Sequence, residues 1–422
     1  MSVRRRRPQR SPGQDHSRTS TPSPSPSRSS SISSLSSSSS PSIQALRCPP
    51  QGTESERKLK LATIHKALTA DPVDVAALRK LAISKGGLLT DDVRRKAWPK
   101  LLNVNLFDVP YKKGVKLESH RDYHQVVLDV NRSLKRFPKG MRDDQREALQ
   151  GQLVDVIVRV LMENEQLHYY QGYHDICVTF LLVVGKEAAF ALVHKLSTHH
   201  LRDFMDSTMD RTRHMLNYLL PIIKKANVEL YDFMERSEVG TVFALAWLIT
   251  WYGHVLNDFR SVVRLYDFFL ACHPLMPVYL AAAIVLYRQE EVLACECDMA
   301  FVHSLLSKIP GNLPMEYLVS QAGDLFVQYP PAEMAKEARL QYKLSTSMSK
   351  HPDFELETLY QRPDKVLQHM SSRINGAAGT PTTTDSQTGS RSSGVIKLAV
   401  WAISAGIGAA ALAVLNTAGE YW

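Results

Sequence analysis

Apolar residues recur at helical spacing over most of the chain between residue 56 and about residue 348. Alternating, strand-like runs bounded by tight turns are hard to find in this interval. Thr90 followed by Asp91 and Asp92 is typical of a helix start, because a hydroxyl caps free amides and acids favour the positive end of the helix dipole. The pattern predicts an all-α fold, with helices over residues 91–102, 118–136, 143–163, 174–184, 186–194, 209–225, 241–252, 258–271, 274–288, 299–308 and 316–327.

Two stretches lack this periodicity. The N-terminal stretch is dominated by Ser, Pro and Arg, and residues 375–394 are mainly Gly, Ser, Thr and Pro. Neither has enough apolar surface to offset the entropy lost on ordering. We therefore expect a disordered tail over residues 1–55, leading helices over 56–86 and a linker over 349–394.

Residues 398–415 carry no charge, and Ser404 is their one polar side chain. A helix of this length spans about 27 Å, which suits a thin bilayer such as that of the endoplasmic reticulum. Lys397 precedes the segment and Glu420 follows it, so the large domain is expected to face the cytosol. The segment predicts a transmembrane tail anchor over 395–416 with a short lumenal end over 417–422. A buried core helix is the less favoured alternative, because a linker precedes the segment.

Charge and cysteine content exclude two classes of function. The net charge is +9, but nine Arg and two Lys against three acids up to Lys60 account for +8 of it, which leaves the core close to neutral. This argues against a nucleic-acid partner, since such proteins carry a basic patch on the folded surface. The five cysteines include no C-x-x-C pair, so we expect reduced thiols and no zinc site.

Most sequence motifs of catalysis are missing. The chain has no phosphate-binding G-x-x-x-x-G-K-[ST] loop, no G-x-S-x-G and no H-E-x-x-H. The stretch 199–203 contains His199, His200 and Asp203, which are metal-ligand residue types. Adjacent helical residues point about 100° apart, so no metal site is expected there. A hydrolase built on this stretch is a weaker alternative function.

The predicted helix over 118–136 places Arg132 opposite its apolar stripe, with Asp129 one turn before it. At this i, i+3 spacing the carboxylate can hold the guanidinium. By residue type alone, the pair is best explained as an exposed salt bridge. The stripe consists of Tyr123, Val126, Val127, Val130 and Leu134.

A second polar site precedes the very apolar stretch 176–184. It reads Tyr169-Tyr170-Gln171-Gly172-Tyr173-His174-Asp175. Gly172 permits a turn or a close approach of another backbone, and Asp175 suits the start of the following helix. By residue type alone, an aromatic staple with a helix cap is the favoured explanation.

In this order, the two sites resemble the I-x-x-D-x-x-R and Y-x-Q signatures of the TBC family of Rab GTPase-activating proteins. Two further segments look like the family's R-x-x-W and R-hydrophobic-x-D elements. Val replaces Ile at position 126, and the Pro that often follows the leading Gly is missing; neither departure touches a catalytic atom. The matching segments are Val126 to Arg132, Tyr169-Tyr170-Gln171, Gly86-Gly87-Leu88 with Arg95-Lys96-Ala97-Trp98, and Arg264-Leu265-Tyr266-Asp267-Phe268-Phe269.

The resemblance implies a multi-helix TBC domain with its core over 87–273 and further helices over 274–348. It implies a GTPase activator, not an enzyme in its own right, that binds a Rab in the GTP-bound state and has no cofactor of its own. The GTP and Mg²⁺ belong to the partner.

The resemblance also assigns roles to residues. Arg132 is implied as an arginine finger that neutralises charge on the γ-phosphate, and Gln171 as the group that orients the attacking water. The supporting residues are Asp129, which orients Arg132, Tyr169 and Gly172, which shape the loop, Asp175, and Arg95 and Trp98, which hold helices together.

Three longer stretches, 167–175, 196–206 and 266–277, look like one particular family member. That member ends in a membrane anchor at the endoplasmic reticulum and acts on Rabs of the early secretory pathway. The resemblance thus implies the same membrane and pathway here. The alternatives are a catalytically silent Rab-binding adaptor and a membrane tether.

Overall fold

The computed structural model describes residues 53–109, 114, 116–133 and 141–377, and every regular element in these ranges is a helix. The predicted all-α fold is confirmed for this part of the chain. None of the helices in these ranges is long and apolar enough to cross a membrane. The predicted anchor over 395–416 and nearly all of the predicted N-terminal tail lie outside the described residues.

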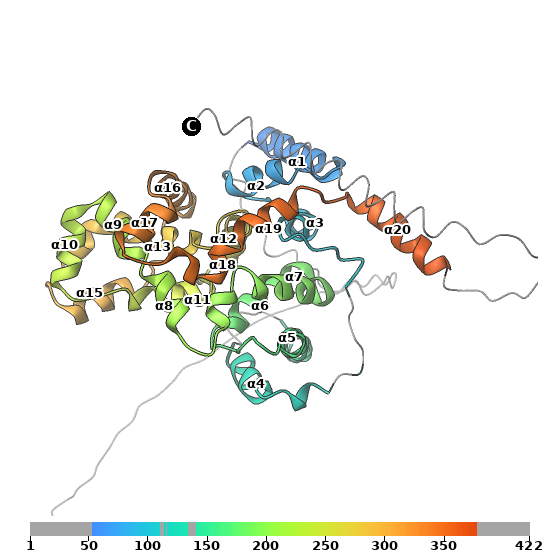
Figure 1. Ribbon diagram of the computed structural model, residues 1–422, viewed down its shortest axis with the longest axis horizontal. Coiled ribbons are helices and arrows are strands. Elements are labelled where there is room, and N and C mark those ends of the chain that lie inside the picture. The colour runs from blue at the N-terminus through green and yellow to red at the C-terminus, as the bar shows by residue number, and fades with distance from the viewer. Residues whose placement is uncertain (1–52, 110–113, 115, 134–140, 378–422) are drawn as a thin grey trace, which may run out of the picture. The chain divides into compact units, whose positions relative to one another are not determined.

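A first group of helices surrounds α5 and α6 (Figure 1). α5 packs against α4, α6 and α7, while α3 packs against α6 and α2. The group consists of α1 (Glu54–Thr69), α2 (Val75–Ile83), α3 (Asp91–Leu101), the 3-10 turn η2 (Leu117–Ser119), α4 (Tyr123–Arg132), α5 (Asp143–Glu163), α6 (Tyr173–Val184) and α7 (Lys186–Thr198).

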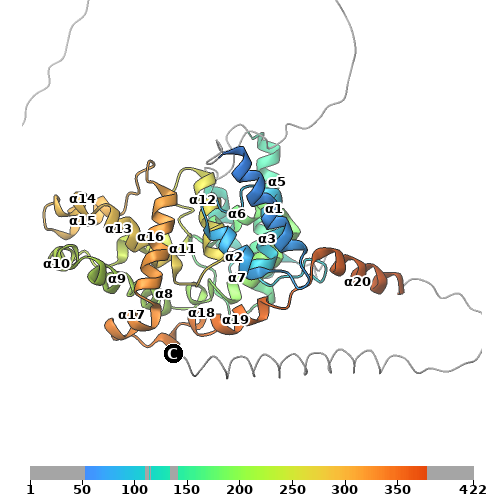
Figure 2. The same ribbon diagram turned by 90° about the horizontal axis from the view of Figure 1, so that it is seen from above.

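A second group is centred on α13, which packs against α9, α11 and α16. Both views place α9, α10 and α13 on the side away from α3 and α7 (Figures 1 and 2). Its elements are η4 (Arg202–Met205), α8 (Asp210–Leu216), α9 (Leu219–Ala226), α10 (Val228–Arg236), η5 (Val242–Ala244), α11 (Leu245–Ile249), α12 (Phe259–Leu270), α13 (Met276–Tyr287), α14 (Gln289–Leu293), α15 (Met299–Leu306), α16 (Met315–Gln328) and α17 (Pro331–Glu337).

Several predicted helices have the expected bounds, and three are broken. The helix predicted over 118–136 is interrupted between η2 and α4. α5 covers 143–163 as predicted, and the Thr90 hydroxyl accepts from the Val93 amide at the start of α3. The predicted helix over 209–225 is interrupted between α8 and α9, because Pro221 cannot donate a backbone hydrogen bond and fits only in a first helical turn. The predicted helix over 241–252 is likewise shortened to η5 and α11.

The linker predicted from residue 349 starts too early. The 3-10 turn η6 (Tyr342–Leu344) leads into α18 (Thr346–Ser349), α19 (His351–Thr358) and α20 (Asp364–Ala377). Phe354 of α19 is only 2% exposed and belongs to the hydrophobic core. The Asp203 carboxylate accepts from the Thr346 and Ser347 amides and so fixes the start of α18. Residues up to Thr358 at least are therefore part of the folded domain.

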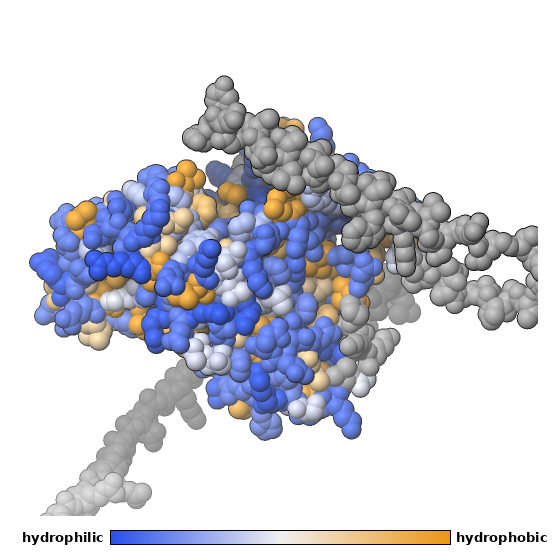
Figure 3. Space-filling view, viewed as in Figure 1, coloured by the Kyte–Doolittle hydropathy of each residue, from blue (hydrophilic) through white to orange (hydrophobic). Residues whose placement is uncertain are grey.

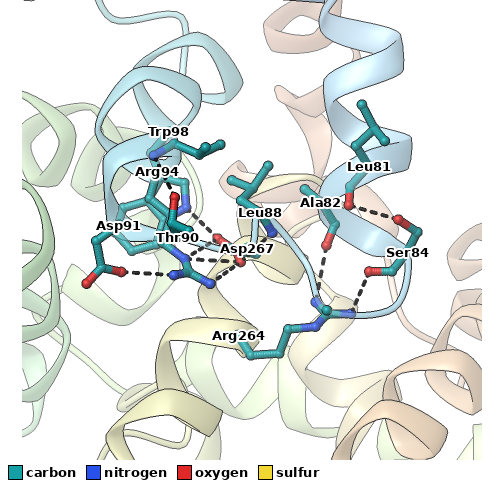
Figure 4. A network of polar contacts seen from close by, with 12 residues as sticks. Leu81, Ala82, Ser84, Leu88, Thr90, Asp91, Arg94, Trp98, Arg264 and Asp267 are labelled. Atoms are coloured by element: carbon teal, nitrogen blue, oxygen red, sulfur yellow. Dashed lines mark hydrogen bonds and ion pairs between the residues drawn. The ribbon is translucent and has the colours of Figure 1, made fainter. Parts of the chain in front are cut away.

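A buried ion pair joins the two groups of helices (Figure 4). Asp267 of α12 is fully buried and accepts from Arg94 Nε and Nη2 at 3.0 and 2.9 Å. It also accepts from Trp98 Nε1 at 2.8 Å and from the Leu88 amide at 2.9 Å. A Cβ on Gly87 would lie 2.5 Å from Asp267 Oδ2, so only glycine allows this approach. The R-x-x-W and R-hydrophobic-x-D elements thus meet in one structural network.

The arginine that pairs with Asp267 in this network is Arg94, whereas the sequence analysis identified Arg95. Arg95 is half-exposed; it donates to the Val183 carbonyl at 3.0 Å and pairs with Asp92. Arg95 and Trp98 both hold α3 to its neighbours, as expected, but only Trp98 reaches Asp267. The i, i+4 spacing of Arg94 and Trp98, which puts both on one helix face, was the signal that could have identified Arg94.

Candidate functional site

The first part of the site is the exposed end of α4. Val126 and Val130 are fully buried at i, i+4 spacing and fix the helix on the domain. Arg132, on the far side of the helix, has 69% of its side chain exposed. The predicted ion pair is present, with 3.8 Å between Arg132 Nη1 and Asp129 Oδ1. This distance is too long for a hydrogen bond, so the guanidinium is held only loosely.

Asp129 is bound more firmly to other groups than to Arg132. Its carboxylate is 1% exposed and accepts from the Tyr169 hydroxyl at 3.0 Å and from Gln125 Nε2 at 3.1 Å. Burial, together with the nearby Asp129 charge, holds the pKa of Tyr169 well above its usual range, so its hydroxyl stays a donor. The Tyr169–Asp129 hydrogen bond therefore connects the two sequence signatures across 40 residues of chain.

The second part of the site is the loop that carries Gln171. The Tyr170 hydroxyl donates to the Ile249 carbonyl at 2.9 Å and anchors one side of the loop. Gly172 has φ of 111°, and a Cβ there would come within 2.9 Å of Thr250 Cγ2. The predicted need for glycine is thus explained by a positive φ and by a close approach of the chain's own Thr250. Gln171, between these two fixed residues, is exposed.

The turn that supports this loop has an unusual backbone. Trp251 and Tyr252 both adopt positive φ, 45° and 63°, although both are buried aromatic residues. Such conformations persist only where the surrounding structure enforces them. The same turn brings His254 Nδ1 to 3.1 Å from Asp175 Oδ2. Asp175, in the first turn of α6 as expected, is thus a buried contact to this turn and not only a helix-start residue.

Three side chains of the site were missed by sequence reasoning: Gln125, His174 and His254. Gln125 lies one turn before Asp129, and that i, i+4 spacing was a usable signal. His174 lies in the polar stretch 169–175, three residues after the second signature, and its Nδ1 is 3.1 Å from the Tyr169 hydroxyl oxygen. No local pattern marks His254, because its partner Asp175 is 79 residues away.

The candidate metal-ligand stretch 199–203 does not form a site. His200 is buried, with its ring edge-on to Trp251 and Phe354. The Asp203 carboxylate accepts hydrogen bonds from the backbone amides at the start of α18. Over the residues that the structure describes, no group of three His, Cys, Asp or Glu side chains could hold a metal ion. These side chains serve packing and capping in the fold.

Side chains on the face seen in Figure 3 are mainly hydrophilic, and the apolar ones form small separate areas. Arg132 and Gln171 are two exposed polar side chains, and the residues next to them are fixed by the hydrogen bonds of Tyr169 and Tyr170. A pair of this kind can reach into the active site of another protein more readily than it can enclose a small substrate.

Comparison with known proteins agrees with this geometry. Residues 91–293 match the family described as Rab-GTPase-TBC domain. The chain is 61% identical over 370 residues to TBC1 domain family member 20 of Homo sapiens, covering 87% of this chain and 91% of that protein. It is 31% identical over 251 residues to GTPase-activating protein gyp10 of Schizosaccharomyces pombe, covering 58% and 67% of the two chains.

Among solved structures, the Ypt/Rab-GAP domain of Gyp1p superposes with a TM-score of 0.52 at 14% identity, covering 64% of this chain and 99% of that domain. At this identity the likeness concerns the fold alone. The match to human TBC1 domain family member 20, by contrast, extends over nearly the whole of both sequences. The chain therefore belongs to the TBC-domain family of Rab GTPase-activating proteins.

Proposed function

We propose that this protein accelerates GTP hydrolysis by inserting Arg132 and Gln171 into the active site of a Rab. During phosphoryl transfer, negative charge builds on the γ-phosphate oxygens and on the β–γ bridge. Arg132 neutralises that charge, and the amide of Gln171 both accepts from and donates to the attacking water. The GTP and the Mg²⁺ ion are those of the Rab.

The observation that carries this proposal is the hydrogen bond between Tyr169 and Asp129. It ties the helix of Arg132 to the loop of Gln171, while both of these side chains are exposed. Because Asp129 also accepts from Tyr169 and Gln125, its carboxylate keeps two hydrogen bonds when Arg132 leaves it for a phosphate.

We further propose that the substrate is a Rab of the early secretory pathway. The segment over 395–416 would act as a tail anchor in the endoplasmic reticulum membrane, with the helical domain in the cytosol. The length of this apolar segment and the charges flanking it support the proposal. An anchor raises the local concentration of the domain at membranes that carry its substrate.

The test is single-turnover GTP hydrolysis by a panel of Rabs with the full chain, Arg132→Ala and Gln171→Ala. We expect the wild-type chain to accelerate at least one Rab by about 10³-fold or more, and Arg132→Ala to abolish most of that gain. Binding of each variant to Rab loaded with a non-hydrolysable GTP analogue serves as the control. Arg146→Ala, which changes an arginine of α5 outside the signatures, should leave the rate unchanged.

The adaptor alternative makes a different prediction. An adaptor would bind GTP-loaded Rab while leaving its hydrolysis rate unchanged. Retention of both Arg132 and Gln171 favours activation over silent binding. A chain truncated after residue 394 distinguishes activation and adaptor binding from membrane tethering. Activation should survive in solution, whereas tethering should be lost.

A further inference from the structure

His174 lies next to the Tyr169 hydroxyl, the same group that donates to Asp129. Its Nδ1 is 3.1 Å from the Tyr169 hydroxyl oxygen, whose other neighbour is Asp129 Oδ2 at 3.0 Å. Only 10% of the His174 side chain is exposed. A water molecule from bulk solvent is therefore poorly placed to take over its contact with the hydroxyl.

The chemistry of these three groups determines where the protons lie. Tyr169 has one hydroxyl proton, and an ionised Asp129 can only accept. The Tyr169 hydroxyl therefore donates to Asp129, as the 3.0 Å contact indicates. Its oxygen then remains an acceptor toward His174, so His174 must carry its proton on Nδ1. The tautomer follows from the neighbours and not from the ring itself.

We propose that His174 is a positioning residue for Arg132, acting through Tyr169 and Asp129; this inference rests on the proposed arginine-finger function. By donating to the Tyr169 oxygen, His174 excludes the rotamer in which the hydroxyl proton turns away from Asp129. Asp129 thus keeps a neutral donor at Oδ2 while Arg132 moves from its 3.8 Å contact toward the phosphate. Without His174, Asp129 holds Arg132 more tightly and for more of the time.

A second carboxylate lies near the far side of the imidazole, beyond hydrogen-bond distance. His174 Nε2 lies 3.9 Å from Asp175 Oδ2, and the same oxygen is 3.1 Å from His254 Nδ1. His254 comes from the strained turn that also touches Gly172. Asp175, which follows His174 in the chain, is thus bound by the same turn that packs against Gly172 in the Gln171 loop.

The test uses the full chain, its Rab substrate and a double-mutant cycle. His174→Phe should lower the maximal single-turnover rate about tenfold, within the usual coupling of one hydrogen-bonded pair, and leave the Kd for GTP-loaded Rab within about twofold. His174→Asn should restore most of the rate, because its Nδ2 lies the same number of bonds from Cα as Nδ1 of histidine. In the Tyr169→Phe background, His174→Phe should add less than about a twofold loss.

Other results would overturn the inference. A tenfold loss that persists in the Tyr169→Phe background, or a His174→Asn variant no better than His174→Phe, means that His174 acts by packing alone. An unchanged rate for His174→Phe rejects any positioning role. Arg132→Ala is measured in parallel: if it retains the wild-type rate, the finger mechanism itself fails, whereas an inactive Arg132→Ala beside a normal His174→Phe rejects only this inference.

A measurement on the unmodified side chain keeps the test independent of how the variants fold. Nitrogen-15 spectra of histidine-labelled full chain report which ring nitrogen carries the proton, and His174→Asn assigns the signal. We expect the Nδ1–H form for His174. An Nε2–H form would contradict the proposed direction of the hydrogen bonds.

Discussion

Replacing Asp267 by Asn should destabilise the domain more than almost any other polar substitution. The carboxylate is fully buried and accepts from four nitrogens of three residues: Nε and Nη2 of Arg94, Nε1 of Trp98 and the Leu88 amide. The Arg94 side chain is 10% exposed, so loss of the Asp267 charge leaves its guanidinium with only Asp91, at 2.9 Å and 47% exposed, as a counter-ion. Breaking a buried pair in this way costs about 3 to 5 kcal/mol.

Urea unfolding followed by tryptophan fluorescence measures this cost, since Trp98 itself donates to Asp267. Asp92→Asn is the matched control, because Asp92 also pairs with an arginine of α3, but with 87% of its side chain exposed. The control should leave the unfolding midpoint within error, as exposed ion pairs contribute little. If Asp267→Asn shifts the midpoint no more than Asp92→Asn, the role assigned to this network is refuted.

Three further predictions concern the site, the C-terminal helices and pH. Gly172→Ala should slow Rab GTP hydrolysis more than tenfold but preserve Rab binding, because a Cβ 2.9 Å from Thr250 displaces the Gln171 loop; equal rates in single-turnover assays would contradict this. Phe354→Ala should lower the free energy of unfolding, measured in urea, by about 3 to 5 kcal/mol. A loss below about 1 kcal/mol would contradict the assignment of α19 to the folded domain. Burial, then the neighbouring His351, lowers the pKa of His273 from 6.5 to about 3, so only the unfolded chain takes up this proton as the pH falls below 6.5. The free energy of unfolding is therefore at its full value above pH 6.5 and falls by up to about 2 kcal/mol at pH 5. Urea unfolding should show a smaller loss at pH 5 for His273→Gln than for the wild-type chain.

Features set by neighbouring residues were predictable from the sequence. Thr90 with the acids after it marked the start of α3, and uninterrupted periodicity marked α5 over its full length. The exposed Arg132 and its i, i+3 partner Asp129 followed from helical geometry alone. In each case the cause lies within about one or two turns of the residue concerned.

Features set by distant residues were not predictable in this way. The burial of Arg94 in place of Arg95 depends on Asp267, 173 residues away. The attachment of Tyr169 to Asp129 requires α4 and the Gln171 loop to be already packed on the same core. α19 has little amphipathic pattern and is held because Phe354 packs against His199 and His200, just after α7, and His351 packs against His273 in the turn before α13. Tertiary contacts override weak local signals at these positions.

The most direct test of the central claim is a change in the Rab. The Rab's own water-positioning glutamine is replaced by Ala, and single-turnover GTP hydrolysis is measured with wild-type chain and with Gln171→Ala. If Arg132 and Gln171 are supplied in trans, the wild-type chain should still accelerate hydrolysis by the altered Rab by at least about a hundredfold, and Gln171→Ala should not. The account would be contradicted if the wild-type chain binds the altered Rab but does not accelerate its GTP hydrolysis.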